Sequence, residues 1–284
     1  MNKTVIERKQ LDKEELDKLK ELARQIRIDI LKMLTRAGSG HTGGSLSAVE
    51  ILVFLYFNWM HYDPKYPMMK ERDRFVLSKG HAAPLLYAIL SKAGFFPKSH
   101  LDNLRKYQSS LQGHPDMHKT PGVEISSGSL GQGLSIANGM ALACRLDDIK
   151  NRIFVLLGDG EIQEGQVWEA AMTAAHYEID NICAFIDYND LQIDGFVHDI
   201  MGIEPVAGKW ESFGWHTIMI DGHDFTQINN ALVEAEQKKK KPTVIIAKTV
   251  KGKGVSKFEN QVRYHGISPT DDELEVALKE LGDE

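Results

Sequence analysis

The sequence has few cysteines, no long hydrophobic run and no excess of positive charge. Its two cysteines, Cys144 and Cys183, lie inside apolar segments, so we expect buried thiols in a reducing cytoplasm rather than a disulfide framework. The apolar stretch 49–57 is too short to span a membrane, and no leader is expected at the N-terminus. The formal net charge of −6 argues against a nucleic acid partner, and the lysine run 238–241 is typical of a solvated helix end.

What the sequence has instead is an alternation of short apolar strands and helices. Strands are expected at 73–77, 153–157, 182–186, 216–220 and 243–248. Helices are expected at 11–34, within 78–90, and at 135–144, 166–176, 225–240 and 271–281. Ser47 and Glu50 have the spacing of a capping box for a further helix. Because no linker interrupts this order, we expect one α/β domain over 1–284, with an open, mainly parallel sheet, helices on both faces and an N-terminal helical extension over 1–36.

Residues 152–195 carry the strongest functional signal. Two apolar strands flank a helix in this segment, and Asp159 and Asn189 each follow the carboxyl end of a strand. Ligands of open α/β sheets bind at this edge, so we expect the two side chains to face one crevice. A carboxylate, an amide oxygen and the carbonyl of Leu191 suit Mg²⁺, and Gly160 allows a backbone N–H to approach a phosphate. The segment therefore predicts a metal-bridged diphosphate.

The same segment resembles a known family signature. GDGEIQEGQVWEA followed by NICAFIDYNDLQIDG is similar to the thiamine diphosphate signature, and the surrounding sequence resembles transketolase. The resemblance covers nearly the whole chain and implies the thiamine diphosphate-binding fold of the PP, or diphosphate-binding, domain. It also implies thiamine diphosphate and Mg²⁺ as cofactors, with Ca²⁺ or Mn²⁺ able to replace Mg²⁺.

Four loops contain histidines that match loops of the transketolase family. The resemblance implies that His41, His81, His114 and His265 polarise the substrate carbonyl, bind hydroxyls and transfer protons. An unperturbed histidine titrates near neutrality, which suits such roles. The family usually has proline after the first of these histidines, and here it is Thr42, so we expect an altered loop stiffness.

Further cofactor contacts are implied by the same resemblance. Two lysines match residues near the diphosphate, a glycine-containing loop matches one that contacts the cofactor rings, and a glutamate matches one at the interface between the two active sites of the family's dimer. These residues are Lys79, Lys251, Gly128, Ser129, Leu130 and Glu164. His81 and His265 are expected to contact the cofactor as well.

The resemblance covers only the diphosphate-binding part of a full-length transketolase. In the family the glutamate that pairs with the aminopyrimidine belongs to the pyrimidine-binding domain, and no segment here resembles that domain. We therefore expect the N-terminal subunit of a split transketolase, which needs a separate C-terminal subunit for activity, in an α2β2 heterotetramer. The pair would transfer a two-carbon ketol group from a ketose or ketose phosphate to an aldose or aldose phosphate.

Three alternatives compete with this interpretation. In a nicotinamide-dependent oxidoreductase, Asp187 would stand where a ribose-binding acid belongs, although Asp159 between the glycines would repel a pyrophosphate without a metal. Another thiamine enzyme, such as a deoxyxylulose-phosphate synthase or an oxo-acid dehydrogenase component, is disfavoured by the four histidine loops. A non-catalytic subunit would need none of these residues. The sequence leaves open whether the sugars are ordinary, branched or sulfonated.

Overall fold

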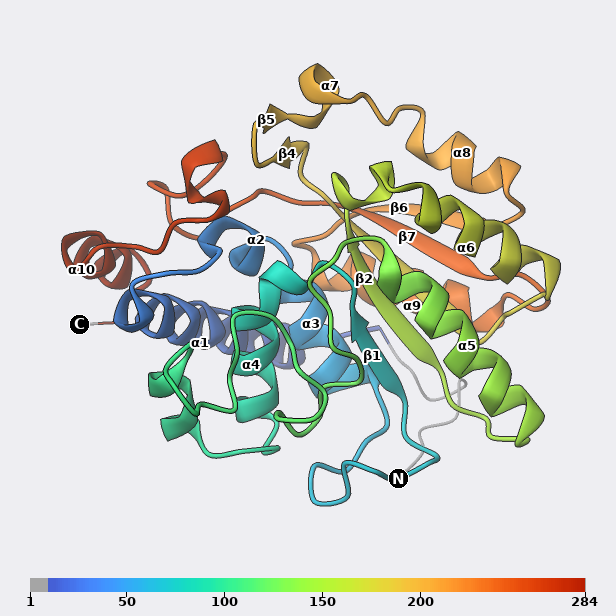
Figure 1. Ribbon diagram of the computed structural model, residues 1–284, viewed down its shortest axis with the longest axis horizontal. Coiled ribbons are helices and arrows are strands. Elements are labelled where there is room, and N and C mark those ends of the chain that lie inside the picture. Colours follow the sequence, from blue (N-terminus) through green and yellow to red (C-terminus); the bar gives the residue numbers. More distant parts are fainter. Residues whose placement is uncertain (1–9, 284) are drawn as a thin grey trace.

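A five-stranded parallel sheet forms the centre of the computed structural model, which describes residues 10–283 (Figure 1). The strand order across the sheet is β1-β2-β3-β7-β6. The strands are β1 (Arg74–Leu77), β2 (Ile153–Gly158), β3 (Ile182–Tyr188), β6 (His216–Asp221) and β7 (Thr243–Lys248). All four pairings are parallel, so the predicted parallel α/β sheet is confirmed.

Helices cover both faces of the sheet (Figure 1). One core contains residues of α1 (Lys13–Ala37), α3 (Val49–Phe54), α4 (Ala83–Lys92) and α9 (Phe225–Gln237). The other core contains residues of α5 (Gln132–Leu146), α6 (Gly165–His176) and α8 (Val206–Ser212). The remaining helices are α2 (Thr42–Leu46), α7 (Val197–Ile200) and α10 (Asp271–Glu280), with shorter 3₁₀ or π turns at Leu55–Trp59, Gly80–Ala82, Lys98–Asn103, Glu161–Gln163 and Val262–His265. The predicted helix at 225–240 ends earlier, at Gln237, so the lysine run follows the helix instead of forming its last turn.

The strand β2 shows why the apolar runs are continuous. Phe154 and Leu156 belong to one core, whereas Ile153, Val155 and Leu157 belong to the other. Successive side chains of a strand point to opposite faces, and both faces of this sheet are covered by helices. Every position of this apolar run is therefore buried, and the sequence has no polar alternation there.

The helix α1 packs into the core along one face. Its N-terminus is fixed by a capping box between Asp12 and Glu15, and Gly38 ends it in the left-handed region at φ 62°. The observed bounds, 13–37, lie a few residues beyond the predicted ones. The predicted extension over 1–36 begins in residues 1–9, which lie outside the described residues.

The predicted capping box of Ser47 and Glu50 is wrong. No side chain caps α3, which begins after Ala48. The Ser47 hydroxyl donates a hydrogen bond to the buried Asp187 carboxylate, and the Glu50 carboxylate pairs with Arg27. Both side chains bond to charged groups that are distant in the sequence. A hydrogen bond to a charged group is stronger than the bond to a backbone N–H that a capping box would provide.

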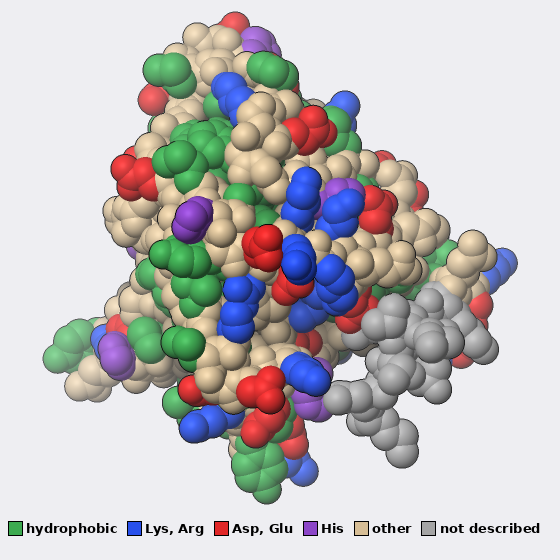
Figure 2. All heavy atoms as spheres, turned by 90° about the vertical axis from the view of Figure 1, so that its right-hand side faces the viewer, with side chains coloured by type: hydrophobic (Ala, Val, Ile, Leu, Met, Phe, Trp, Pro, Cys, Tyr) green, Lys and Arg blue, Asp and Glu red, His purple; other side chains and the backbone are tan. Residues whose placement is uncertain are grey.

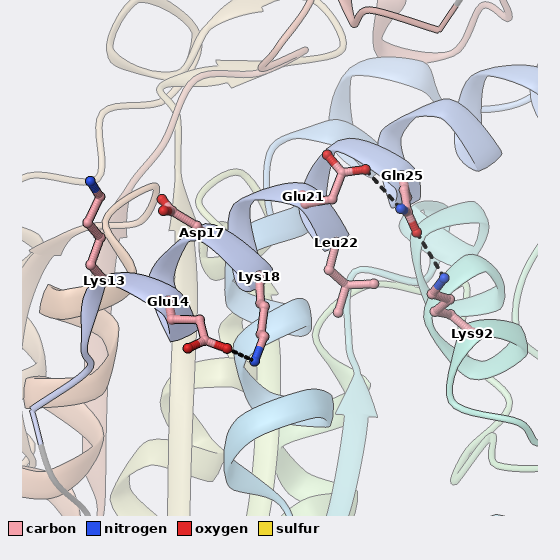
Figure 3. A pocket seen from close by; sticks show the side chains of 8 residues that line it. All are labelled: Lys13, Glu14, Asp17, Lys18, Glu21, Leu22, Gln25 and Lys92. Atoms are coloured by element: carbon pink, nitrogen blue, oxygen red, sulfur yellow. Dashed lines mark hydrogen bonds and ion pairs between the residues drawn. The ribbon is translucent and has the colours of Figure 1, made fainter.

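The surface has a face with many charged side chains and an open depression. On the face shown in Figure 2, lysine and arginine side chains gather near the middle, with acidic side chains between them. An open depression of about 720 Å³ runs along the first half of α1 (Figure 3). Several of its charged side chains bond to neighbours that also line it, as in Lys18 to Glu14 and Lys92 to Gln25, and none of the residues lining it is a predicted site residue. Within residues 10–283, no helix is both long enough and apolar enough to cross a membrane.

Candidate cofactor and substrate site

Asp159 joins the carboxyl ends of β2 and β3. The two strands are neighbours, with Gly158 opposite Asp187 in the register. One oxygen of the Asp159 carboxylate accepts a hydrogen bond from the Gly160 N–H at 2.8 Å, and the other accepts from the N–H of Asn189 at 2.8 Å and from that of Asp190. Burial, and then the negative charge of Asp187, raise the pKa of Asp159 to about 6.

The loop after β3 brings two more oxygens to this point. Asp190 adopts φ 59°, and the Asn189 side-chain oxygen accepts a hydrogen bond from the Leu191 N–H at 3.2 Å. The Leu191 carbonyl accepts from the ammonium of Lys251 at 2.6 Å. The Asp159 carboxylate, the Asn189 side-chain oxygen and the Leu191 carbonyl therefore belong to two adjacent loops at one edge of the sheet, and oxygens of these kinds are ligands that Mg²⁺ accepts. Among the described residues, no group of three His, Cys, Asp or Glu could hold a metal, so a cation here would use amide and carbonyl oxygens.

Four histidines from separate segments converge beside this turn. The His41 ring lies 5.3 Å from His81, 6.2 Å from His114 and 5.7 Å from His265, measured between ring centroids. The His81 and His265 rings stack at 5.2 Å. His41 immediately precedes α2, so the glycine-containing segment is a helix start rather than an open loop. The fold thus brings together the histidines that the sequence placed in four loops.

These imidazoles are held neutral. Burial is the largest cause, followed for His41 by the charge of Arg105, and the pKa of His41 falls to about 4. Burial and Lys251 lower the pKa of His265 to about 3, and the pKa values of His81 and His114 are lowered as well. The pKa of an unperturbed histidine, near neutrality, therefore does not apply to these four side chains, because a buried cluster surrounded by cations disfavours further positive charge.

A buried ion pair lies beneath the site. The Lys79 ammonium pairs with the Asp187 carboxylate, and the side chains are 2% and 0% exposed. It also donates to the carbonyl of Gly44 at 3.0 Å, so this lysine links the His41 segment to β3. Asp187 accepts further bonds from the hydroxyls of Ser47 and Thr249, which leaves no free carboxylate for a ribose. This arrangement argues against the nicotinamide alternative.

Lys251 differs from Lys79 in having no carboxylate at ion-pair distance among the described residues. Its ammonium bonds to the Leu191 carbonyl and lies 2.9 Å from the His265 Nδ1. Burial, and then the charge of Lys79, lower the pKa of Lys251 to about 8. A buried cation whose direct hydrogen-bond partners are neutral has capacity for an anionic ligand.

The loop that contains Gly128, Ser129 and Leu130 lies against the histidines. A Cβ added at Gly128 would lie 3.3 Å from the His114 ring, and one added at Gly80 would lie 2.8 Å from the Gly128 nitrogen. Only glycine permits this backbone approach. Glu164 is exposed and occupies the N-cap position of α6 without a side-chain capping bond.

Two further residues at this site, Glu161 and Arg105, were not predicted from the sequence. Glu161, the residue after Gly-Asp-Gly, is buried and bonded to three loops, as described below. Arg105 influences the pKa of both His41 and His114. Glu161 directly follows the Gly-Asp-Gly turn, and this position could have indicated a role at the site. Nothing in the local sequence indicates such a role for Arg105.

The fold defines an α/β protein whose candidate site lies at the carboxyl ends of a parallel sheet. A family model, "Transketolase, thiamine diphosphate binding domain", matches residues 18–284. The chain is 45% identical over 263 residues to a 6-deoxy-6-sulfo-D-fructose transketolase subunit of Clostridium sp. (strain MSTE9), covering 93% of this chain and 96% of that protein. It is 45% identical over 270 residues to an apulose-4-phosphate transketolase subunit of Actinobacillus succinogenes, covering 94% and 97%.

A solved structure agrees with these sequence matches. The transketolase of Campylobacter jejuni superposes with a TM-score of 0.88 at 35% identity, over 93% of this chain and 42% of that one. The chain belongs to the transketolase family and is the counterpart of its N-terminal, thiamine diphosphate-binding part. The predicted family, fold and transferase class are confirmed.

Proposed function

We propose that this chain is the N-terminal subunit of a two-subunit transketolase that transfers a two-carbon ketol group from a ketose to an aldose. The observation that carries the proposal is the convergence of four histidines beside the Asp159 turn. A nucleotide-binding edge would need no such cluster of neutral donors. The assignment of individual roles below belongs to the proposal.

The oxygens at the strand ends would hold the metal. Asp159, Asn189 and the Leu191 carbonyl would hold Mg²⁺, and the charge of Lys251 would help to neutralise a diphosphate. Lys79 would act on the diphosphate only through its charge, because its ammonium is bound by the Asp187 carboxylate. When bound, thiamine diphosphate supplies the carbanion chemistry, and the protein supplies position and electrostatics.

The neutral histidines would orient the sugar. A neutral imidazole offers one N–H donor and one acceptor nitrogen, so the cluster can both donate to a carbonyl oxygen and accept from hydroxyls. The Nδ1 of His41 is buried and has no hydrogen-bond partner in the structure, which leaves it available to a ligand. His265, beside Lys251, would lie between the diphosphate end and the sugar end of the site.

A separate C-terminal subunit is part of the proposal. Support comes from the two relatives that are named as subunits and are matched over nearly their whole length. Exposed apolar side chains follow the short strand β4 (Leu191–Gln192), on β5 (Gly195–Phe196), on α7 and in the residues beside them, and they offer a surface for such a partner. The exposed residues are Ile193, Phe196, Ile200 and Met201. An α2β2 assembly and a cytoplasmic location, for which the free buried cysteines Cys144 and Cys183 are support, complete the proposal.

The test is reconstitution with the product of the neighbouring reading frame, if that frame encodes a pyrimidine-binding domain. The chain alone, supplied with thiamine diphosphate and Mg²⁺, should show negligible ketol transfer, and addition of the partner should restore it. Ketose donors should include pentose phosphates, branched sugars and sulfonated sugars, because two relatives are named for sugars of the last two kinds. Rapid turnover by the isolated chain would overturn the two-subunit proposal.

A further inference from the structure

Glu161 is a buried carboxylate that touches three loops of the site. It lies in the turn Glu161–Gln163 between β2 and α6, and the residue is 2% exposed. One carboxylate oxygen accepts from the Ser78 hydroxyl and from the Gly131 N–H at 2.9 Å, and the other accepts from the Gly158 N–H at 3.0 Å. All three donors are uncharged.

Each of these donors belongs to a segment with proposed site residues. Ser78 immediately precedes Lys79, Gly131 immediately follows Leu130, and Gly158 immediately precedes Asp159. The segments come from distant parts of the chain, and only the fold brings them together. One side chain thus connects the lysine turn (residues 78–79), the glycine loop (residues 128–133) and the metal turn (residues 158–160).

Two of these segments also contact each other directly. The Ser78 hydroxyl accepts a hydrogen bond from the Gly133 N–H at 3.1 Å, and a Cβ added at Gly133 would lie 2.5 Å from the Ser78 side chain. Gly131 adopts φ 82°, a conformation that glycine tolerates best. Displacement of the lysine turn would therefore disturb the glycine loop as well.

A carboxylate is the side chain that fits these three donors. No basic group among residues 10–283 lies within ion-pair distance of Glu161, whose carboxylate is held by the three uncharged donors. An unpaired buried carboxylate is costly, and a glutamine would avoid that cost. A glutamine, however, would place its side-chain NH₂ group against N–H or O–H donors of the loops, where no acceptor is available. An ionised carboxylate accepts with both oxygens.

We infer that Glu161 is the positioning residue that holds the lysine turn, the glycine loop and the metal turn in their binding arrangement before the cofactor arrives. The inference rests on the proposed function, since it names what the three loops are arranged to bind. It assigns Glu161 no contact with cofactor or substrate. Its effect is preorganisation, because loops that are already ordered lose less entropy on binding.

The experiment compares Glu161→Gln with Glu124→Gln. Glu124 is a matched control, because it is also a buried glutamate but bonds to Arg72 at the opposite end of the sheet. Amide hydrogen exchange of the whole chain is measured without cofactor. Affinity is measured by titration calorimetry with thiamine diphosphate in saturating Mg²⁺, on the chain alone and with its partner subunit.

Glu161→Gln should speed exchange at the amides of Gly131 and Gly158 and weaken cofactor affinity by about 10- to 100-fold, the usual effect of losing an outer partner of a metal site. Glu124→Gln should change neither quantity at this edge, even where it lowers the unfolding midpoint. Ser78→Ala removes one of the three donors to Glu161, together with the acceptor of the Gly133 N–H, and should change exchange and affinity in the same direction by a smaller amount. If Glu161→Gln does not fold, Ser78→Ala replaces it as the test of the inference.

Unchanged exchange and affinity in Glu161→Gln, or in Ser78→Ala if the first variant does not fold, would overturn the inference. Equal losses of affinity in Glu161→Gln and Glu124→Gln would also overturn it, since the effect would then be general destabilisation. An unmodified chain that binds no thiamine diphosphate, even with its partner, would remove the proposed function and the inference about the cofactor. The exchange data would still show whether Glu161 braces the loops, so the two failures are distinguishable.

Discussion

Two buried ion pairs lie at opposite ends of the sheet, and they differ in their surroundings. At the amino end, Arg72 and Arg74 pair with Glu124, and Arg72 also donates to the carbonyls of Pro67 and Asp73. The Arg74 side chain is 23% exposed, so water reaches this group. At the carboxyl end, Lys79 and Asp187 are sealed from solvent.

The difference lies in what each pair does to its neighbours. The charge of Lys79 helps to lower the pKa values of His41, His81 and His265, and the charge of Asp187 helps to raise the pKa of Asp159. The amino-end pair has no comparable cluster of shifted histidines around it among the described residues. The amino-end pair therefore only holds a loop against the sheet. The carboxyl-end pair also influences the protonation states of the histidines and of Asp159.

The largest expected effect comes from breaking the sealed pair. Asp187→Asn leaves the Lys79 ammonium buried without a counter-ion and should lower the free energy of unfolding by about 3–5 kcal/mol, measured by urea denaturation. Glu124→Gln should cost only about 1–3 kcal/mol, because carbonyls and water still solvate its arginines. Adding Lys79→Met to Asp187→Asn should recover part of the loss. A larger loss from Glu124→Gln would reverse the contrast between the two ends.

Next in size is the loss of a proposed metal ligand. Asp159→Ala should weaken binding of thiamine diphosphate in Mg²⁺ by more than about 100-fold, because loss of a direct ligand should exceed the loss caused by an outer partner. The measurement is calorimetry on the reconstituted complex. Asp180→Ala, a change at an aspartate outside the proposed site, is the control and should bind normally. Retained affinity in the Asp159 variant would remove this residue from the metal site.

A smaller effect is expected from pH. An unfolded histidine takes up a proton near pH 6.5, whereas folded His41 and His265 take one up only at about pH 4 and about pH 3. Between these values the unfolded chain binds more protons, so stability falls as the pH decreases from 6.5 towards 4. Asp159, whose pKa is raised to about 6, opposes this trend, as do Asp73 and Glu161, whose pKa values burial also raises.

The pH dependence can be measured by urea denaturation at about pH 7 and about pH 5, where the chain should be less stable at the lower value. His265→Gln should flatten the slope, because glutamine does not titrate in this range. His100→Gln, at an exposed histidine, is the control and should keep the slope. An unchanged slope in His265→Gln would contradict the assignment of the pH dependence to the histidine cluster.

The smallest effect concerns the charge at the edge of the cluster. Arg105 is exposed, and its guanidinium is the next cause after burial of the low pKa values of His41 and His114. Arg105→Gln should raise both pKa values by less than about one unit, since solvent screens an exposed charge. Proton NMR titration of the imidazoles would measure the change, with Lys106→Gln as the control. No shift would show that Arg105 lies too far from the rings to matter.

Much of the fold could be predicted from local patterns. The continuous apolar runs predicted the strands because both faces of the sheet are covered, and strand β7 was predicted with its observed bounds, 243–248. Helix ends were less accurate, as at Gln237, because apolar periodicity does not mark the last turn. The Ser47 capping box failed because its hydroxyl bonds to Asp187, which is 140 positions away in the chain.

For the candidate site, the sequence could name residue types but not their surroundings. The Gly-Asp-Gly turn and Asn189 were recognisable because parallel strands end at one edge. The charge state of His41 was not recognisable, since its low pKa comes from burial and from cations on other segments. The role of Asp187 was also hidden, because a ribose-binding acid and a buried counter-ion look alike in a sequence.

By itself, the sequence determined the strand order along the chain, the Gly-Asp-Gly turn after β2 and the membership in the transketolase family. These depend on short segments whose meaning is fixed by local spacing. Only the tertiary structure decided that the four histidines meet, that Lys79 is bound by Asp187, and that Glu161 connects three loops. The physical reason is that burial and Coulomb interactions depend on distance in space, and neighbours along the chain do not define that distance.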